Sequence, residues 1–158
     1  GRSDSGKTTL ITRLLPELKR RGLQVGVAKH CPHGFDLDQP GKDSWNFTEA
    51  GADGIFLISP EQIGLIRRVD RSVPLHSLLE NYFSGFDLVI LEGLGKEKGI
   101  KKVEVVRKGV SEGLESASEE LVACITDMEL KVPCPVFRPD EIEAIVSFLE
   151  DLTKRNHN

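Results

Sequence analysis

Apolar residues recur along the chain with a helical period in some segments and as short unbroken runs in others. Leu10, Leu14 and Leu18 lie four residues apart, which predicts an amphipathic helix in the first part of the chain. Pro16 falls inside this helix and is expected to kink it. Gly22 is placed to end it. Further helices are predicted over residues 44–53, 73–83 and 138–155.

Short apolar runs predict the strands, over residues 23–30, 54–58, 63–68, 87–93, 103–107 and 121–126. Four residues, "SPEQ", separate the second run from the third, so these two are expected to form a hairpin. The fourth run, "DLVILEG", is typical of a central strand covered on both faces. Strands that alternate with helices predict an α/β fold, with a mainly parallel sheet and helices on both faces, in a single domain over residues 1–158.

Composition excludes some classes of function. The chain has 158 residues and a formal net charge of −4, which argues against nucleic acid as its main partner. No apolar run approaches the length that crosses a membrane. The three cysteines have no C-x-x-C spacing, so we expect reduced thiols and a cytoplasmic protein.

The first eight residues follow a phosphate-binding pattern. Gly1, Gly6, Lys7 and Thr8 stand at the spacing G-x-x-x-x-G-K-[ST], in which backbone amides surround the phosphates of a nucleotide. The lysine reaches the β- and γ-phosphates, and the hydroxyl ligates Mg²⁺. Such a loop follows a buried strand, which we expect to precede Gly1 and to be missing from the given chain. The residues expected at the nucleotide are Gly1, Asp4, Ser5, Gly6, Lys7, Thr8 and Thr9.

Glu92 ends the continuous apolar run 87–93 and is a second candidate on the metal side. In mainly parallel sheets, ligands bind beyond the carboxyl ends of the strands. A carboxylate at the end of a central strand, opposite a phosphate loop, resembles the Walker B arrangement that holds Mg²⁺. Thr8 and Glu92 are therefore expected to share one magnesium ion.

The polar loop after residue 29 admits three interpretations. It is a switch segment that senses the γ-phosphate, a transition-metal site, or a solvated loop with only local hydrogen bonds. The metal interpretation would use His30, Cys31, His33, Asp36 and Asp38, but their spacing fits no closed zinc pattern.

Asp127 follows the apolar run 121–126 and is expected on the ligand side of the sheet. Guanine presents an N1–H and an exocyclic amine that one carboxylate accepts together, so Asp127 is a candidate reader of a guanine base. The lysine of the N-K-x-D guanine motif is absent, and a turn-forming aspartate is the alternative interpretation.

Three stretches together resemble the MobB family of molybdopterin-guanine dinucleotide biosynthesis proteins: "GRSDSGKTTLITRLLPELKRRG", "KHCPHGFDLDQPGKDSWNFTEAGA" and "DLVILEG". The pattern K-H-x-x-H-x-x-D-x-D-x-P-G-K-D-S followed by A-G-A discriminates more than the phosphate loop does. The resemblance carries over a signature loop of Lys29, His30, His33, Asp36, Asp38, Pro40, Gly41, Lys42, Asp43 and Ser44.

What the resemblance implies is a P-loop fold that binds GTP and Mg²⁺ and hydrolyses GTP weakly. It also implies a homodimer with a cytoplasmic accessory role beside a separate, MobA-like guanylyltransferase, which attaches GMP to the molybdenum cofactor. Molybdopterin is a further ligand to be considered. The residues expected to act in hydrolysis are Lys7, Asp38 and Glu92.

Two other classes of function stay open on the residues alone. A small-molecule kinase or ATP-driven ligase would need an arginine-lined acceptor pocket, and Arg67, Arg68 and Arg71 are clustered. A metal-delivery GTPase would carry its cargo on His30 and His33. The blander interpretation of the arginines is the solvated end of a hairpin.

Overall fold

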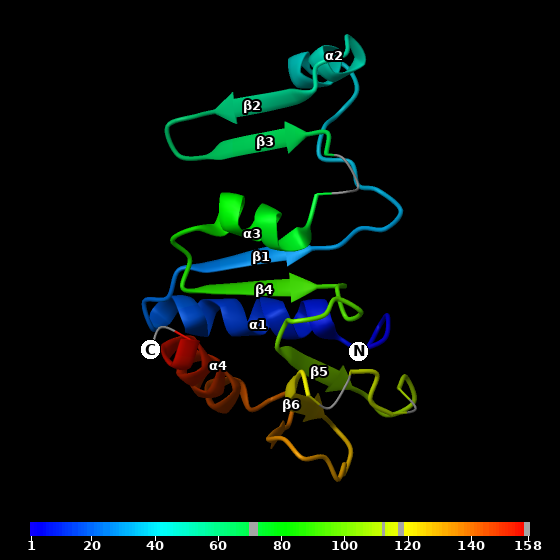
Figure 1. Ribbon diagram of the computed structural model, residues 1–158, viewed down its shortest axis with the longest axis vertical. Helices are drawn as coiled ribbons and strands as arrows, with labels where there is room; N and C mark the ends of the chain where they lie inside the picture. The colour runs from blue at the N-terminus through cyan, green and yellow to red at the C-terminus, as the bar shows by residue number, and fades with distance from the viewer. Residues whose placement is uncertain (70–72, 112, 117–118, 157–158) are drawn as a thin grey trace. The chain divides into compact units, whose positions relative to one another are not determined.

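The computed structural model describes residues 1–69, 73–111, 113–116 and 119–156. The chain forms two compact units, one made of Gly1–His30 with Gly85–Asn158 and the other of Cys31–Ser84. Figure 1 shows the order of the elements along the chain.

The first unit is a mainly parallel α/β arrangement, as predicted. Strand β1 (Val25–Lys29) pairs in parallel with β4 (Leu88–Glu92). Strands β5 (Lys102–Val106), β6 (Leu121–Thr126) and β7 (Val136–Phe137) form a second parallel sheet in that order. Helices α1 (Lys7–Arg20) and α4 (Ile142–Asn156) complete the unit. The short strand β7 was not predicted from the sequence.

Helix α1 forms where the leucine stripe predicts it. Leu10, Leu14 and Leu18 are its buried residues, and the helix continues through Pro16 as one element. The helix ends in a Schellman arrangement, because the Gly22 N–H donates to the Lys19 carbonyl and the next N–H donates to the Leu18 carbonyl.

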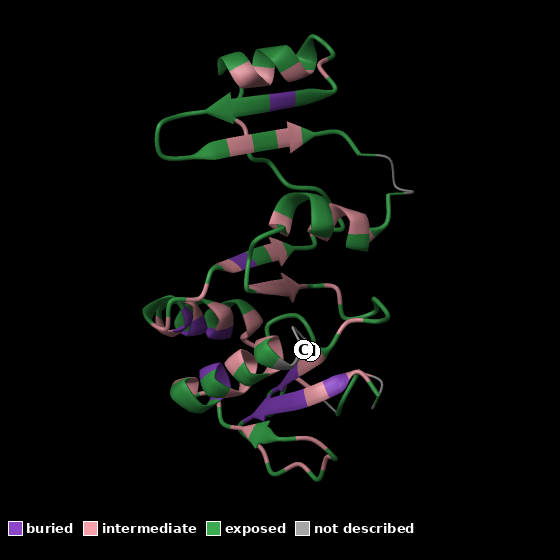
Figure 2. Cartoon of the chain, turned by 60° about the vertical axis from the view of Figure 1, so that its left-hand side comes forward, coloured by how far each residue is buried: buried purple, intermediate pink, exposed green. Residues whose placement is uncertain are grey.

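One apolar core holds the first unit together. The stripe of α1 packs with Val105 of β5, Ile125 of β6, and Ile145 and Val146 of α4. Figure 2 shows that β6 and the inner faces of these helices are buried. Cys124 on β6 is fully buried, and burial raises the pKa of its thiol to about 11. Strand β4 is only half-buried and, within the residues described, pairs with β1 alone, so the prediction of a strand covered on both faces is not met here.

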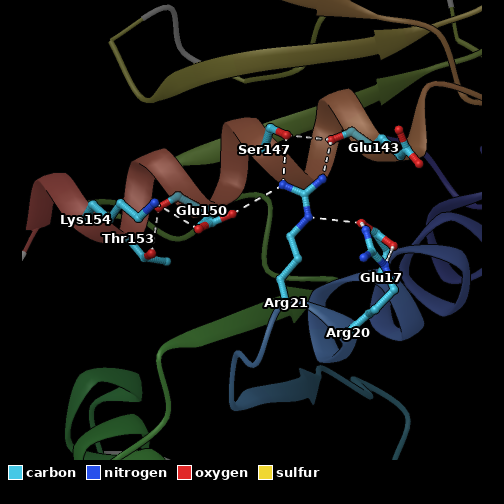
Figure 3. A network of polar contacts seen from close by, with 8 residues as sticks. All are labelled: Glu17, Arg20, Arg21, Glu143, Ser147, Glu150, Thr153 and Lys154. Carbon is cyan, nitrogen blue, oxygen red and sulfur yellow. Dashed lines mark hydrogen bonds and ion pairs between the residues drawn. The ribbon is translucent and has the colours of Figure 1, made fainter.

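A polar network joins the end of α1 to α4 (Figure 3). The Arg21 guanidinium donates to Glu17 at 3.0 Å, to Ser147 Oγ at 2.8 Å and to Glu150 at 3.3 Å. It also donates to the backbone carbonyl of Glu143 at 3.3 Å. Glu17 accepts two further bonds from Arg20, and these arginines lower the pKa of Glu17 to about 2.

The second unit contains a helix, a hairpin and another helix: α2 (Asp43–Glu49), β2 (Gly54–Ile58), β3 (Ile63–Arg67) and α3 (Leu75–Phe83). The two strands are antiparallel, which confirms the predicted hairpin. Phe56 opposes Leu65 and Ile58 opposes Ile63, and all four side chains are exposed on one face of the hairpin. We call this surface the hairpin face.

No helix in the described part of the chain is both long enough and apolar enough to cross a membrane. No disulfide links Cys31, Cys124 or Cys134, all of which the structure describes, and Cys31 and Cys134 are half-buried.

Candidate functional site

The backbone of the predicted phosphate loop forms an open N-terminus for α1. Asp4 and Gly6 have φ angles of +61° and +87°, and Ser5 is buried beneath the loop. Gly6 is the N-cap, and no described side chain caps the helix at this end. The first amides of this 14-residue helix point out of its N-terminal end, as they do in any α-helix, and Gly6 enters the helix through left-handed backbone. Uncapped amides of this kind attract anions.

The Lys7 ammonium lies against the loop itself. It donates to the Gly1 carbonyl at 2.9 Å, to the Arg2 carbonyl, and to Ser5 Oγ at 3.4 Å. All three acceptors are neutral, so no carboxylate compensates the positive charge of Lys7 in these contacts. The charge is therefore held at the loop, where a phosphate would lie.

Thr8 and Glu92 meet, as the sequence predicts for a shared metal. The Thr8 hydroxyl donates to Glu92 Oε1 at 2.6 Å, and the Lys29 ammonium lies 4.0 Å from Glu92 Oε2. Glu92 reaches this point because it is the last residue of β4, at the carboxyl end of the parallel pair with β1. A hydroxyl and a carboxylate are both oxygen ligands of the type that Mg²⁺ prefers, so these two residues fit the ion.

His30 and Gly93 extend the same strand pair. The His30 N–H donates to the Glu92 carbonyl at 2.8 Å, which continues the pairing of β1 with β4 beyond their ends. Gly93 turns the chain with a φ of +89°, and a Cβ there would lie 3.2 Å from the His30 carbonyl oxygen. The strand end therefore requires glycine at this position.

Most of the signature loop belongs to the second unit. Asp38 organises it, since Oδ1 accepts bonds from the Gln39 N–H at 2.9 Å and the Ser44 hydroxyl at 3.0 Å. Its Oδ2 is buried with no hydrogen-bond partner among the described residues. The turn then leads through Gly41 to Lys42, the N-cap of α2, and Asp43, its first residue.

The remaining loop residues are exposed, namely His33, Asp36 and Pro40. Within the described ranges, no three His, Cys, Asp or Glu side chains lie close enough together to hold a metal ion. The A-G-A residues after α2 line a hollow of about 570 Å³ with Phe47 and β2. Arg67 and Arg68 are exposed at the end of β3, whereas Arg71 lies outside the described residues.

Asp127 follows β6 and has two neighbours on the turn after β5. Its Oδ1 accepts the Lys108 N–H at 2.9 Å, and its Oδ2 lies 3.9 Å from Arg107 Nε. The Arg107 guanidinium also reaches the phosphate loop, because a Cβ on Gly6 would lie 3.3 Å from one of its nitrogens. Sequence reasoning missed Arg107, which belongs to no motif and was predicted as the last residue of the strand over residues 103–107.

Glu104 is a second residue that the motifs do not reveal. This carboxylate on β5 is 1% exposed and accepts the N–H groups of Glu115 at 2.7 Å and Ser116 at 2.9 Å. Glu115 in turn forms an ion pair of 3.2 Å with Arg2 of the phosphate loop. Glu104 thus ties the segment 113–116 to the loop.

Comparison with known families decides the relationship. The family model described as MobB, molybdopterin guanine dinucleotide synthesis protein B, matches residues 1–127. The chain belongs to the MobB family. This confirms the resemblance carried by the phosphate loop, the signature loop and the strand that ends at Glu92.

Relatives and solved structures agree with MobB membership over nearly the full chain. The molybdopterin-guanine dinucleotide biosynthesis adapter protein of Haemophilus influenzae is 32% identical over 99% of this chain and 88% of its own length. The Escherichia coli protein of the same name is 30% identical over 98% and 91%. A crystal structure of molybdopterin-guanine biosynthesis protein B superposes with a TM-score of 0.74 at 34% identity, covering 95% of this chain and 94% of that one. Bacillus subtilis MobB gives 0.74 at 30% identity, covering 94% of each chain.

Proposed function

We propose that this MobB-family protein binds a guanine nucleotide with Mg²⁺ at its phosphate loop and acts as an adapter in the synthesis of molybdopterin guanine dinucleotide. The adapter role rests on family membership and on the names of its relatives. The observation that carries nucleotide binding is the meeting of Thr8 and Glu92 beside the uncapped start of α1.

In this proposal the charges of the site divide into two groups. The helix amides and the Lys7 ammonium bind phosphate oxygens, and Lys7 exchanges its contacts with the Gly1 and Arg2 carbonyls for them. Thr8 and Glu92 hold the Mg²⁺, which neutralises charge on the phosphates when bound. The Lys29 ammonium lies 4.0 Å from the other oxygen of Glu92.

The signature loop is the proposed switch. A switch acts through contacts that differ between triphosphate and diphosphate, and within its own unit Asp38 organises the loop that would change conformation. Hydrolysis, which would use Lys7, Asp38 and Glu92, is slow in this proposal until a partner completes the site.

The proposed partners follow from the adapter role. They are a second copy of the chain and the guanylyltransferase that attaches GMP to molybdopterin, both in the cytoplasm. The hairpin face supports a protein partner, because four exposed apolar side chains on one small sheet are typical of an interaction surface.

Titration calorimetry with GTP, GDP and ATP, each with and without Mg²⁺, tests nucleotide binding. Lys7→Ala is expected to lower triphosphate affinity about ten-fold or more, because a charge-assisted hydrogen bond contributes about 1.5–3 kcal/mol. Lys19→Ala removes the same charge from an exposed position further along α1 and serves as the control. Unchanged triphosphate affinity in Lys7→Ala would contradict the proposal.

The metal side has its own test. Glu92→Gln is expected to weaken Mg²⁺-dependent GTP binding more than metal-free GDP binding, since only the former uses the carboxylate as a metal ligand. Equal losses would make Glu92 structural. Preference for ATP over GTP, with phosphate transfer to an added acceptor, would favour the kinase alternative.

A further inference from the structure

We propose that Arg107 is a second cation of the phosphate site, that it contacts the phosphates of the bound nucleotide beside Lys7, and that Asp127 positions it. This inference rests on the proposed nucleotide binding at the phosphate loop.

The position of the guanidinium is the first step. Arg107 directly follows β5, and one of its terminal nitrogens lies 3.3 Å from where a Cβ on Gly6 would be. Gly6 is the N-cap of α1, so the guanidinium lies close to the N-cap residue of that helix. An arginine and a helix N-terminus both attract anions, so the two features at this point favour one anionic ligand. A phosphate satisfies both.

The backbone at Arg107 is fixed by its own turn. The Arg107 carbonyl accepts the N–H groups of Val110 and Ser111, at 3.1 Å and 3.0 Å, and Gly109 takes a φ of +78° in between. Asp127 anchors the same turn by accepting the Lys108 N–H. The side chain of Arg107 therefore starts from a defined point on the rim of the loop.

The ion pair with Asp127 orients the guanidinium and leaves its N–H donors for a ligand. Arg107 Nε lies 3.9 Å from Asp127 Oδ2, beyond hydrogen-bond distance, and the two side chains are 57% and 38% exposed. An exposed pair at this separation contributes little to stability. A guanidinium carries five N–H donors in a planar fork that matches phosphate oxygens, so donors are left for a ligand.

This role for Asp127 competes with its reading of a guanine base. One Asp127 oxygen accepts the Lys108 N–H and the other faces Arg107, whereas guanine recognition needs both oxygens turned to the base. The two roles give opposite results in Asp127→Asn. The asparagine oxygen can still accept the Lys108 N–H, while the charge that attracts Arg107 is lost.

Calorimetric titration of GTP, GDP and GMP onto the wild-type protein and Arg107→Gln tests the phosphate contact. We expect a loss of about ten-fold or more for GTP, a smaller loss for GDP, and less than about two-fold for GMP. Lys108→Gln removes the neighbouring exposed charge and is the control, with GTP affinity expected within about two-fold of the wild type. Arg107→Lys should restore part of the GTP affinity, since it keeps the charge without the fork.

A double-mutant cycle tests the positioning role of Asp127. Asp127→Asn should lower the affinities for GTP and xanthosine triphosphate by the same factor. In the Arg107→Gln background it should cause no further loss of affinity. A switch of preference to xanthosine triphosphate, or an equal loss in both backgrounds, would overturn the positioning role.

Failure of the inference differs from failure of the proposed function. Wild-type protein that binds no nucleotide overturns both. Wild-type protein that binds GTP while Arg107→Gln binds it equally well, or loses GTP and GMP affinity by the same factor, overturns the phosphate contact alone. Lys108→Gln matching the loss of Arg107→Gln would reduce the effect to general surface charge and would also overturn it.

Discussion

Gly93 shows how one residue sets the geometry of the metal side. It follows Glu92 directly, adopts left-handed backbone, and passes close to the His30 carbonyl. The same stretch carries the His30 N–H bond to the Glu92 carbonyl. The direction of the Glu92 side chain therefore depends on a turn that only glycine enters without strain.

We predict that Gly93→Ala destabilises the protein by about 1–2 kcal/mol, the typical cost of a non-glycine residue in left-handed backbone. The new methyl group would also press on the His30 carbonyl and displace Glu92, so Mg²⁺-dependent GTP affinity should fall. Urea denaturation and calorimetry measure the two effects. Gly95→Ala is the matched control, because its Cβ would meet nothing within 4 Å; equal destabilisation by both variants would contradict the prediction.

At the scale of elements, α1 links the phosphate loop to the core. Its first residues form the loop, its leucine stripe packs on β5, β6 and α4, and its last turn joins the Arg21 network. Sequence alone predicted the helix and its stripe, because both depend on local spacing. It could not predict the bonds from Arg21 to α4, whose partners lie 122–129 residues away in sequence.

The Arg21 network predicts a dependence of stability on pH. The pKa of Glu17 falls from 4.5 to about 2 on folding, chiefly through its hydrogen bonds to Arg20 and Arg21. A lowered carboxyl pKa stabilises the fold above pH 4.5, and this contribution is lost as the pH falls from 4.5 toward 2. The pKa of Glu150 is lowered in the same direction, by Lys154 and Arg21.

Glu17→Gln should therefore flatten the acid limb of a plot of melting temperature against pH, with little slope change near neutrality. Differential scanning calorimetry from pH 7 to pH 2 measures this. Glu49→Gln changes an exposed carboxylate at the end of α2, outside the network, and is the control; its plot should run parallel to that of the wild type. A Glu17→Gln plot parallel to that of the wild type would contradict the assignment.

At the scale of the whole molecule, the hairpin face is an apolar surface that the described part of the chain leaves exposed. Phe56, Ile58, Ile63 and Leu65 are 54%, 73%, 70% and 43% exposed, and they form two cross-strand pairs on one face. Side chains of this size favour burial by about 1.5–3 kcal/mol each. A second copy of the chain would bury the same face on both partners.

On the proposed homodimer, Ile58→Lys with Ile63→Lys is expected to shift sedimentation from dimer to monomer, because charges replace a directly opposed apolar pair. Gln62→Lys adds one charge in the same hairpin without removing an apolar side chain, and should leave the dimer intact. A wild-type protein that sediments as a monomer at all concentrations would contradict the dimer.

The fold and the Thr8–Glu92 contact were both predictable from the sequence, but from different kinds of pattern. Alternating strands and helices predicted the mainly parallel fold, and motif spacing predicted that Thr8 and Glu92 would meet, since both lie at strand or helix ends. Arg107 was not accessible, because its proximity to Gly6 arises only when β5 and α1 pack on one core. The two-residue strand β7 was too short to show a pattern.

The burial of Cys124 makes its thiol a probe of how often the surrounding sheet opens. Its thiol is fully covered in the β5–β6–β7 sheet, and its high pKa keeps it in the unreactive protonated form. An alkylating reagent can reach it only during moments when that sheet opens. With Cys31 and Cys134 replaced by serine, the rate of mass gain would report how often the sheet opens, and the change of that rate on adding nucleotide would report how far binding at the loop steadies the strands behind it.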